Sequence, residues 1–75
     1  MSSLVYHNFE VAPKPVAPFS HAVESNGWIQ LTGQMPTYPD EDTRPPPFGI
    51  EAQTKRVMDN LIIILTKLNL SLENV

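Results

Sequence analysis

The sequence has 75 residues, no cysteine and a formal net charge of −3, so it can hold at most one small domain. A chain of this length buries a small share of its surface on folding, and without disulfides or thiolate metal sites it is expected to need a partner. Five scattered basic residues argue against nucleic acid as a partner. The start lacks a signal-peptide pattern, and the apolar run 61–65 is too short to cross a bilayer, so a cytoplasmic protein is expected.

Residues 4–9 are predicted to form a first edge strand. Pro13, Pro15 and Pro18 then exclude regular structure from residues 12–19, which are expected to run extended. Alternating patterns resume at 20–25 and 28–34 on either side of Asn26 and Gly27. Because both of these residues tolerate positive φ, the pattern predicts an antiparallel hairpin.

The stretch 28–34 alternates strictly, which places Ile29, Leu31 and Gly33 on one face of the predicted strand. The opposite face carries Trp28, Gln30, Thr32 and Gln34. One face is therefore expected to pack on a helix and the other to form an outer or subunit-contact surface. Gly33 has two interpretations. It either permits the bend into Met35 and Pro36, or leaves the backbone open to close approach by a ligand or another chain.

Two histidines raise the question of catalysis, since the imidazole pKa lies nearest neutrality. His21 has no acidic partner at a telling spacing, which favours a structural role over a catalytic one, and His7 is a weaker candidate still. No cluster of His, Cys, Asp and Glu has the spacing of a metal site, so no metal is expected.

Residues 36–49 combine prolines with an acidic run and are predicted to form a loop between strand and helix. Such a loop shapes a binding site or serves as a solvated connector. Arg44 within it either meets a carboxylate substrate or neutralises the acidic run, and the second interpretation is favoured.

Residues 50–69 are predicted to form an amphipathic helix. Its apolar stripe consists of Ile50, Thr54, Val57, Met58, Leu61, Ile64, Leu65 and Leu68. Ile62 lies on the flank of this stripe and Ile63 nearly opposite its centre. One helix on three strands has no use for either, and Ile62 is expected to pack on a second helix that the chain lacks. Because residues 71–75 stop at an apolar residue where a strand could begin, the chain is expected to be interrupted.

The order and spacing of several short motifs from about Ala12 onward resemble the RidA family (YjgF/YER057c/UK114, once called L-PSP endoribonucleases). The motifs are PVAPFSHAV at 15–23, NG at 26–27, LTGQMP at 31–36, IEAQT at 50–54, DNL at 59–61 and SLENV at 71–75. The resemblance covers the N-terminal half of a typical member, which continues through a strand, a second helix and two more strands. It implies an α+β, chorismate-mutase-like fold, here an incomplete β-β-β-α portion in one partial domain over 1–75.

The resemblance also implies a homotrimer with sites between subunits, in which enamines and imines such as 2-aminoacrylate are hydrolysed to 2-oxo acids and ammonia without a cofactor. The family's substrate-binding arginine and water-positioning glutamate belong to the half not in this chain, so no catalytic residue is expected here, and Arg44 does not occupy the arginine's position. The implied substrate-binding residues are Phe19, where many members have tyrosine, Thr32 and Gly33.

Three functions follow from the resemblance. The first is an imine deaminase of which this chain is an inactive fragment. The alternative is a non-catalytic module that binds a metabolite or a subunit. A distant third is an endoribonuclease that inhibits translation, against which the acidic charge balance argues.

Overall fold

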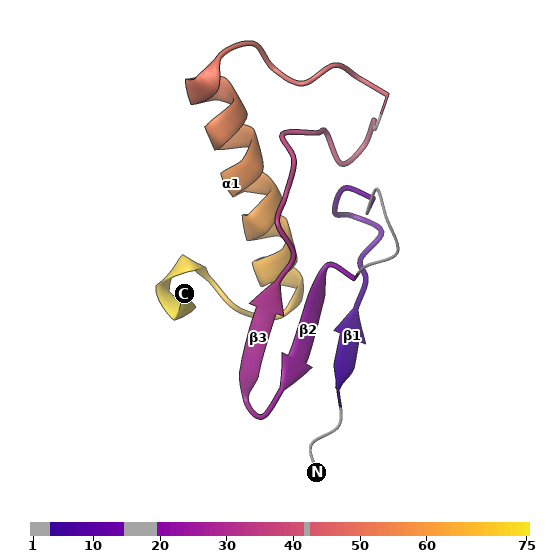
Figure 1. The fold of residues 1–75 in the computed structure, drawn as a ribbon, viewed down its shortest axis with the longest axis vertical. Helices are drawn as coiled ribbons and strands as arrows, with labels where there is room; N and C mark the ends of the chain where they lie inside the picture. Colours follow the sequence, from indigo (N-terminus) through magenta and orange to yellow (C-terminus); the bar gives the residue numbers. More distant parts are fainter. Residues whose placement is uncertain (1–3, 15–19, 42) are drawn as a thin grey trace.

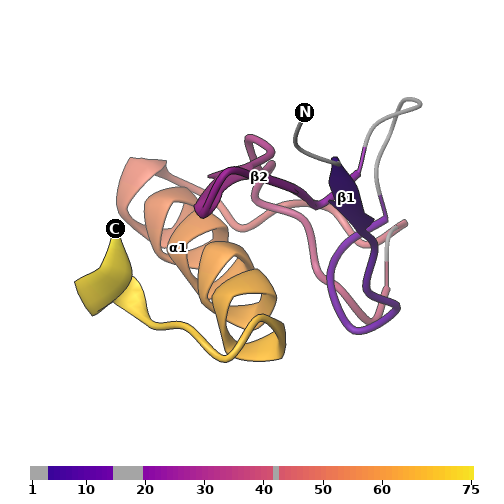
Figure 2. The same ribbon diagram turned by 90° about the horizontal axis from the view of Figure 1, so that it is seen from below.

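A computed structural model describes residues 4–14, 20–41 and 43–75. The elements are β1 (Val5–His7), β2 (Ala22–Ser25), β3 (Trp28–Leu31), α1 (Ile50–Lys67) and a short 3₁₀ helix, η1 (Leu72–Asn74). The strands form one antiparallel sheet in the order β1-β2-β3. The long helix lies along one side of this sheet, and a loop after β3 leads back to its start (Figures 1 and 2). The predicted α+β class is confirmed.

The predicted hairpin is confirmed at its turn and in its register. Asn26 and Gly27 have φ values of 54° and 79°, the pair of left-handed conformations that a two-residue hairpin loop requires. Ser25 pairs with Trp28, and the ladder continues to the pair of Ala22 and Leu31.

All three strands are shorter than the expected ranges 4–9, 20–25 and 28–34. The strand β1 ends at His7 because the Phe9 N–H donates to Nδ1 of His21, at 2.9 Å, and no longer to a strand. At the other edge, the Thr32 N–H still donates to the His21 carbonyl, at 3.0 Å, before the chain leaves the sheet. The sheet therefore ends on one side where Nδ1 of His21 replaces a strand carbonyl as the acceptor. It ends on the other side where the chain leaves the sheet after Thr32.

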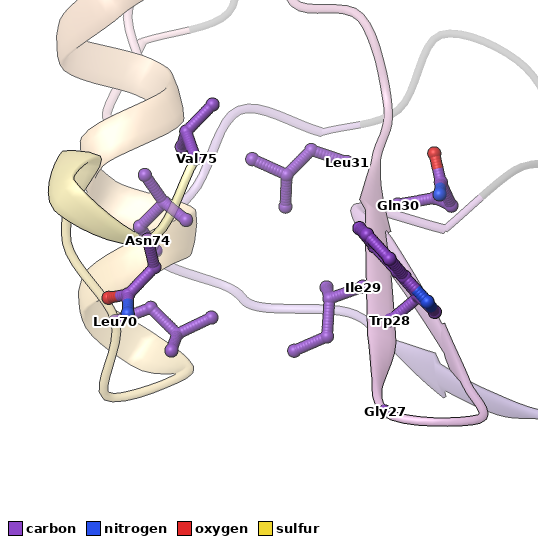
Figure 3. A pocket seen from close by; sticks show the side chains of 9 residues that line it. Gly27, Trp28, Ile29, Gln30, Leu31, Leu70, Asn74 and Val75 are labelled. Atoms are coloured by element: carbon purple, nitrogen blue, oxygen red, sulfur yellow. The ribbon is translucent and has the colours of Figure 1, made fainter.

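The core lies between the sheet and the helix. Its buried apolar members are Ala12, Ala22 and Ile64, and the side chains packed around them are Phe9, Ile29, Leu31, Ile63 and Leu68. Figure 3 shows Ile29 and Leu31 on one side of β3, with Trp28 and Gln30 on the other. Trp28 is 73% exposed, so the predicted alternation of faces is confirmed.

The helix packs Ile64 and Leu68 of its predicted apolar stripe on the core, but the packed face is shifted from the centre of that stripe. Ile63, expected nearly opposite the packed face, packs against the core, while Ile50 is 77% exposed. The cause is Asn60, which is fully buried and donates from Nδ2 to the carbonyls of Met35, at 3.0 Å, and Thr37, at 2.8 Å. These two hydrogen bonds turn the Asn60 side of the helix toward the chain that follows β3.

The helix ends at Lys67, two residues before the predicted end, and is followed by a left-handed residue two positions later. Asn69 has φ 60°. The Leu70 N–H donates to the Leu65 carbonyl, at 2.8 Å, and the Asn69 N–H to the Thr66 carbonyl, at 3.0 Å. This is a Schellman motif, which satisfies the last helical carbonyls and turns the chain back beside the helix.

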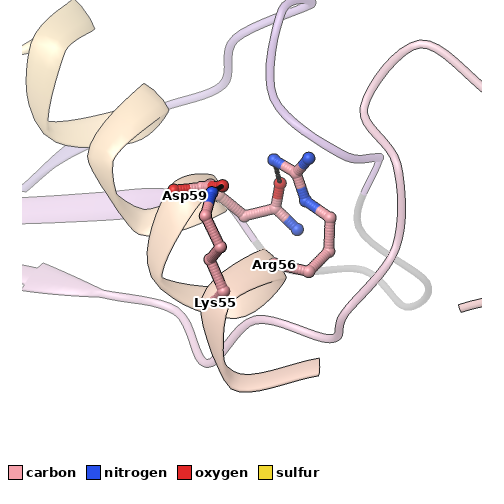
Figure 4. Close-up of polar contacts among 4 residues, drawn as sticks. Lys55, Arg56 and Asp59 are labelled. Carbon is pink, nitrogen blue, oxygen red and sulfur yellow. Dashed lines mark hydrogen bonds and ion pairs between the residues drawn. The ribbon is translucent and has the colours of Figure 1, made fainter. Parts of the chain in front are cut away.

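The solvent side of the helix carries an ion pair between Lys55 Nζ and Asp59 Oδ2, at 2.7 Å, one turn apart (Figure 4). The hydrogen bond from Lys55 lowers the pKa of the Asp59 carboxyl, helped by the positive charges of Lys55 and Arg56 and opposed by slight desolvation. This contribution to stability is present above the ordinary carboxyl pKa and is lost as the pH falls through the lowered value. An exposed pair of this kind stabilises the fold weakly.

Ile62, expected to lie uncovered in this chain, is 39% exposed. Phe48, two residues before the helix, is 99% exposed. Within the described ranges, the structure contains no helix with the length and apolar character needed to cross a membrane.

Candidate functional site

Thr32 is positioned directly after β3 by two interactions with the start of the neighbouring strand. Its hydroxyl donates to the Ser20 carbonyl, and its backbone N–H donates to the His21 carbonyl. The side chain is half-buried. The hydroxyl proton is therefore engaged within the chain, and the Thr32 oxygen remains able to accept a hydrogen bond.

Gly33 lies next along the chain and is exposed. A Cβ built at this position meets no atom within 4 Å, and Gly33 is not among the residues with positive φ. Neither backbone conformation nor packing inside the described chain therefore requires glycine here. This favours the interpretation in which a ligand or another chain approaches the Gly33 backbone, over a glycine needed only for a bend.

The third residue that the resemblance implies, Phe19, lies outside the described residues. The structure thus places Thr32 and Gly33 side by side at the end of the edge strand β3, and their relation to Phe19 stays a prediction. Gln34 follows, with Nε2 donating to the Thr32 carbonyl, at 3.4 Å.

His21 has the structural role that the sequence favours. It is 3% exposed, and Nδ1 accepts the Phe9 N–H while Nε2 lies 2.6 Å from the Pro13 carbonyl oxygen. These contacts define a neutral imidazole protonated at Nε2. With both nitrogens bonded to backbone, His21 has none free for chemistry.

His7 has an acidic partner that spacing along the chain did not reveal. Its Nε2 lies 3.1 Å from Glu24 Oε1, across the β1–β2 ladder. The rings of His7, Phe9 and His21 stack in a row, with centroid distances of 6.0 and 6.1 Å. Both histidines thus tie the N-terminal segment to the sheet.

A groove of about 600 Å³ lies between the inner face of β3 and the segment after the helix (Figure 3). Its lining residues are Gly27, Trp28, Ile29, Gln30, Leu31, Leu65, Leu70, Asn74 and Val75. The side chains of Ile29 and Leu31 point toward Leu70 and Val75 across it. Since no lining side chain is ionisable and the Gln30 side chain lies on the other side of β3, the groove offers mainly apolar contact, which suits docking better than acid–base chemistry.

The loop between β3 and α1 holds Arg44 over an aromatic ring, and its contact with a carboxylate substrate stays a prediction. Its guanidinium carbon lies 3.9 Å from the ring centroid of Tyr38, and no ion pair joins it to a carboxylate of the described residues. Neutralisation of the acidic run by direct contact is therefore not what the described loop shows.

Together, a three-stranded antiparallel sheet, one covering helix and an open glycine at the end of the edge strand define a small α+β unit. A family model described as Endoribonuclease L-PSP matches residues 9–75, and the chain belongs to this family, as its resemblance to RidA proteins predicted.

Known relatives agree in sequence and in structure. The RutC family protein PYRAB12510 of Pyrococcus abyssi is 39% identical over 66 residues, covering 88% of this chain and 51% of the relative. Protein MMF1, mitochondrial, of Saccharomyces cerevisiae is 32% identical over 66 residues, covering 88% and 44%. The crystal structure of YEO7_yeast matches with a TM-score of 0.80 and 32% identity, covering 92% of this chain and 54% of that one. The chain spans about half the length of the curated relatives it matches.

Proposed function

We propose that this chain forms part of an enamine/imine deaminase that hydrolyses reactive imino acids, such as 2-aminoacrylate, to 2-oxo acids and ammonia. The observation that carries the proposal is the family match over residues 9–75, which includes the open Gly33 at the end of β3. The proposed reaction needs no cofactor. An imine carbon is itself an electrophile, and catalysis reduces to holding the substrate and placing water.

In this proposal Thr32, Gly33 and Phe19 build one wall of the substrate cleft. The Gly33 backbone lets the substrate approach closely, the Thr32 oxygen accepts a hydrogen bond beside it, and Phe19 contributes a ring without a hydroxyl. A guanidinium that grips the carboxylate and an acid that positions water must come from outside residues 1–75. Arg44 does not replace the guanidinium, since its position lies over Tyr38.

Replacing Gly33 by valine in a polypeptide extended by the remaining half, natural or grafted from the Pyrococcus abyssi relative, is expected to lower kcat/KM for 2-aminoacrylate at least about tenfold. The valine side chain occupies space that the substrate needs, yet meets nothing within this chain. The assay is release of 2-oxo acid from enzymatically generated 2-aminoacrylate.

The matched control is Gln34→Val, which adds a β-branched residue one position further along. Melting temperatures of both variants should stay within a few degrees of the parent. A Gly33→Val protein that melts normally and keeps the parental kcat/KM would show that Gly33 is not part of the substrate site. An extended parent that releases no 2-oxo acid would refute the deaminase itself.

The proposed assembly is a homotrimer in which other copies and the remaining half cover the apolar surfaces exposed here. Those surfaces are the groove beside β3 and the exposed side chains of Trp28, Phe48 and Ile50. Residues 1–75 alone are therefore expected to self-associate or to unfold without cooperativity. Analytical ultracentrifugation and thermal melting check this, and a compact monomer with a sharp transition would contradict it.

The apolar groove also supports the second candidate, a non-catalytic module that binds a metabolite or a subunit. Its lining contains no ionisable group, so burial of an apolar partner is its evident use. The two candidates separate in one measurement. An extended protein that binds 2-oxo or imino acids in calorimetry and turns none over supports the module.

The family model's description names an endoribonuclease, and this activity is the third candidate. The chain has five basic residues against eight acidic ones, and Lys55 is paired with Asp59. A weak electrostatic attraction for phosphates follows. Cleavage of RNA by the extended protein, abolished together with its deaminase activity by Gly33→Val, would reverse this order of candidates.

We also propose a cytoplasmic location. The relative MMF1 is named mitochondrial, so cell fractionation with an antibody against the chain is the deciding measurement.

A further inference from the structure

A second cluster of functional side chains lies in the loop after β3, away from Thr32 and Gly33 in sequence. Its centre is the ring of Tyr38. Arg44 lies over this ring at 3.9 Å and Arg56, from α1, at 5.5 Å, both within cation–π range. The loop is held in shape by backbone hydrogen bonds from Glu41 N–H to the Tyr38 carbonyl, at 3.3 Å, and from Arg44 N–H to the Glu41 carbonyl, at 3.2 Å.

Arg56 is held in position by the buried amide of Asn60. Its Nη2 donates to Asn60 Oδ1, at 3.0 Å, while Asn60 Nδ2 is fully engaged with the Met35 and Thr37 carbonyls. Figure 4 shows Arg56 beside the Lys55–Asp59 pair, with a dashed line at the hydrogen bond of its own guanidinium. The orientation of this guanidinium is thus determined by the fold before any ligand arrives.

The Nε–H of Arg56 is buried and has no acceptor among the described residues. A buried donor without a partner is unfavourable, because it has lost its hydrogen bond to water and has formed no other. Such a group in an otherwise satisfied cluster points to an acceptor that the described residues do not supply.

The charge of the cluster points the same way. The described ion pairs involve His7 with Glu24 and Lys55 with Asp59, so neither arginine is neutralised by a carboxylate of the described chain. Two guanidinium groups therefore converge on one aromatic ring in a protein whose net charge is −3. Like charges held this close favour binding of an anion between them.

We propose that Arg44, Arg56 and Tyr38 form a binding site for the oxyanion of a small molecule, a carboxylate or a phosphate. One oxygen accepts the Nε–H of Arg56, and another accepts from Arg44, whose exposed side chain rotates off the ring to admit the ligand. Arg56 is the fixed half of this site and Arg44 the mobile half. The site shares no residue with the proposed deaminase cleft and does not depend on that activity.

The test uses the two arginine side chains as reporters. The polypeptide extended by the remaining half is ¹⁵N-labelled, and the Nε signals of Arg44 and Arg56, the two arginines of residues 1–75, are assigned by their loss in Arg44→Gln and in Arg56→Lys. This extended protein is titrated with inorganic phosphate and, separately, with succinate at about 150 mM salt. We expect a saturable shift of the Arg56 Nε–H signal with at least one of them, and the stronger of the two identifies the chemistry of the ligand.

Variants separate a built site from general charge attraction. Arg44→Gln and Arg56→Lys should each weaken binding about tenfold or more, the second although it keeps the charge, because lysine lacks the Nε–H and the planar fork. Lys55→Gln, on the same helix, should leave affinity unchanged, since that ammonium is paired with Asp59. Arg44→Gln lies at an exposed position, so it remains informative if an Arg56 variant unfolds.

The proposal is overturned if neither anion shifts the Arg56 Nε–H signal of the parent protein in a saturable way. It is equally overturned if Arg44→Gln binds as tightly as the parent, or if Lys55→Gln weakens binding as much as Arg44→Gln does. The last result would mean that the anions respond to net charge alone.

Discussion

The 75-residue chain by itself is expected to release no 2-oxo acid from 2-aminoacrylate above the rate of spontaneous hydrolysis. The proposed reaction needs a cation to anchor the substrate carboxylate and an acid to position water. Removal of a bidentate charged anchor commonly costs several kcal/mol, and each 1.36 kcal/mol is about tenfold in rate. The described residues next to Gly33 are Thr32 and Gln34, which supply neither group.

The measurement is 2-oxo acid release by the purified short chain, with its mass verified, beside the same sequence extended by the remaining half. Restored turnover in the extended protein is the expected contrast. Saturable hydrolysis by the short chain would show that the catalytic groups lie within residues 1–75. In that case Arg44 and Arg56 would be the first residues to replace, because they carry the described guanidinium groups.

Replacing Asn60 by leucine is expected to destabilise the fold by about 2–4 kcal/mol. The side chain is fully buried, and its loss leaves the Met35 and Thr37 carbonyls and Nη2 of Arg56 without their partner. Leucine has nearly the same size, so the effect reports lost hydrogen bonds more than lost volume. Since small domains have a total stability of about 5–15 kcal/mol, this one change should shift the whole unfolding curve.

Urea unfolding followed by far-UV circular dichroism, on the extended protein, measures this effect. The control is Asp59→Asn, the adjacent residue on the solvent side, which removes only the exposed pair with Lys55 and should change the midpoint little at neutral pH. An Asn60→Leu protein as stable as the parent would show that the two carbonyls find other partners, and the account of the helix orientation would fail.

Local signals were sufficient to predict the hairpin and the position of the helix. Asn26 and Gly27 adopt the two positive φ values that these residue types tolerate, independently of the surrounding structure. The alternation of Ile29 and Leu31 against Trp28 follows from the geometry of any strand with one covered face. The short motifs identified the family from about Ala12 onward, and the match over residues 9–75 agrees.

The sequence also singled out Gly33, and its role in binding stays a prediction. The structure shows an open position with ordinary φ, which does not require glycine for its own chain and leaves room for a ligand or another chain. The partner of His7 was beyond sequence reasoning, because Glu24 becomes its neighbour only across the ladder of two strands.

By itself, the sequence determined the elements, their order and the family, because these depend on side-chain periodicity and on turns of two residues. Only the tertiary structure decided which side of the helix faces the sheet. The apolar stripe predicts that Asn60 lies on the surface. Its amide is buried instead, because it donates to the carbonyls of Met35 and Thr37, which lie 25 and 23 positions earlier in the chain. Burial of a polar group depends on such distant partners, so Ile63 entered the core and Arg56 turned toward Tyr38 for a reason that no local pattern contains.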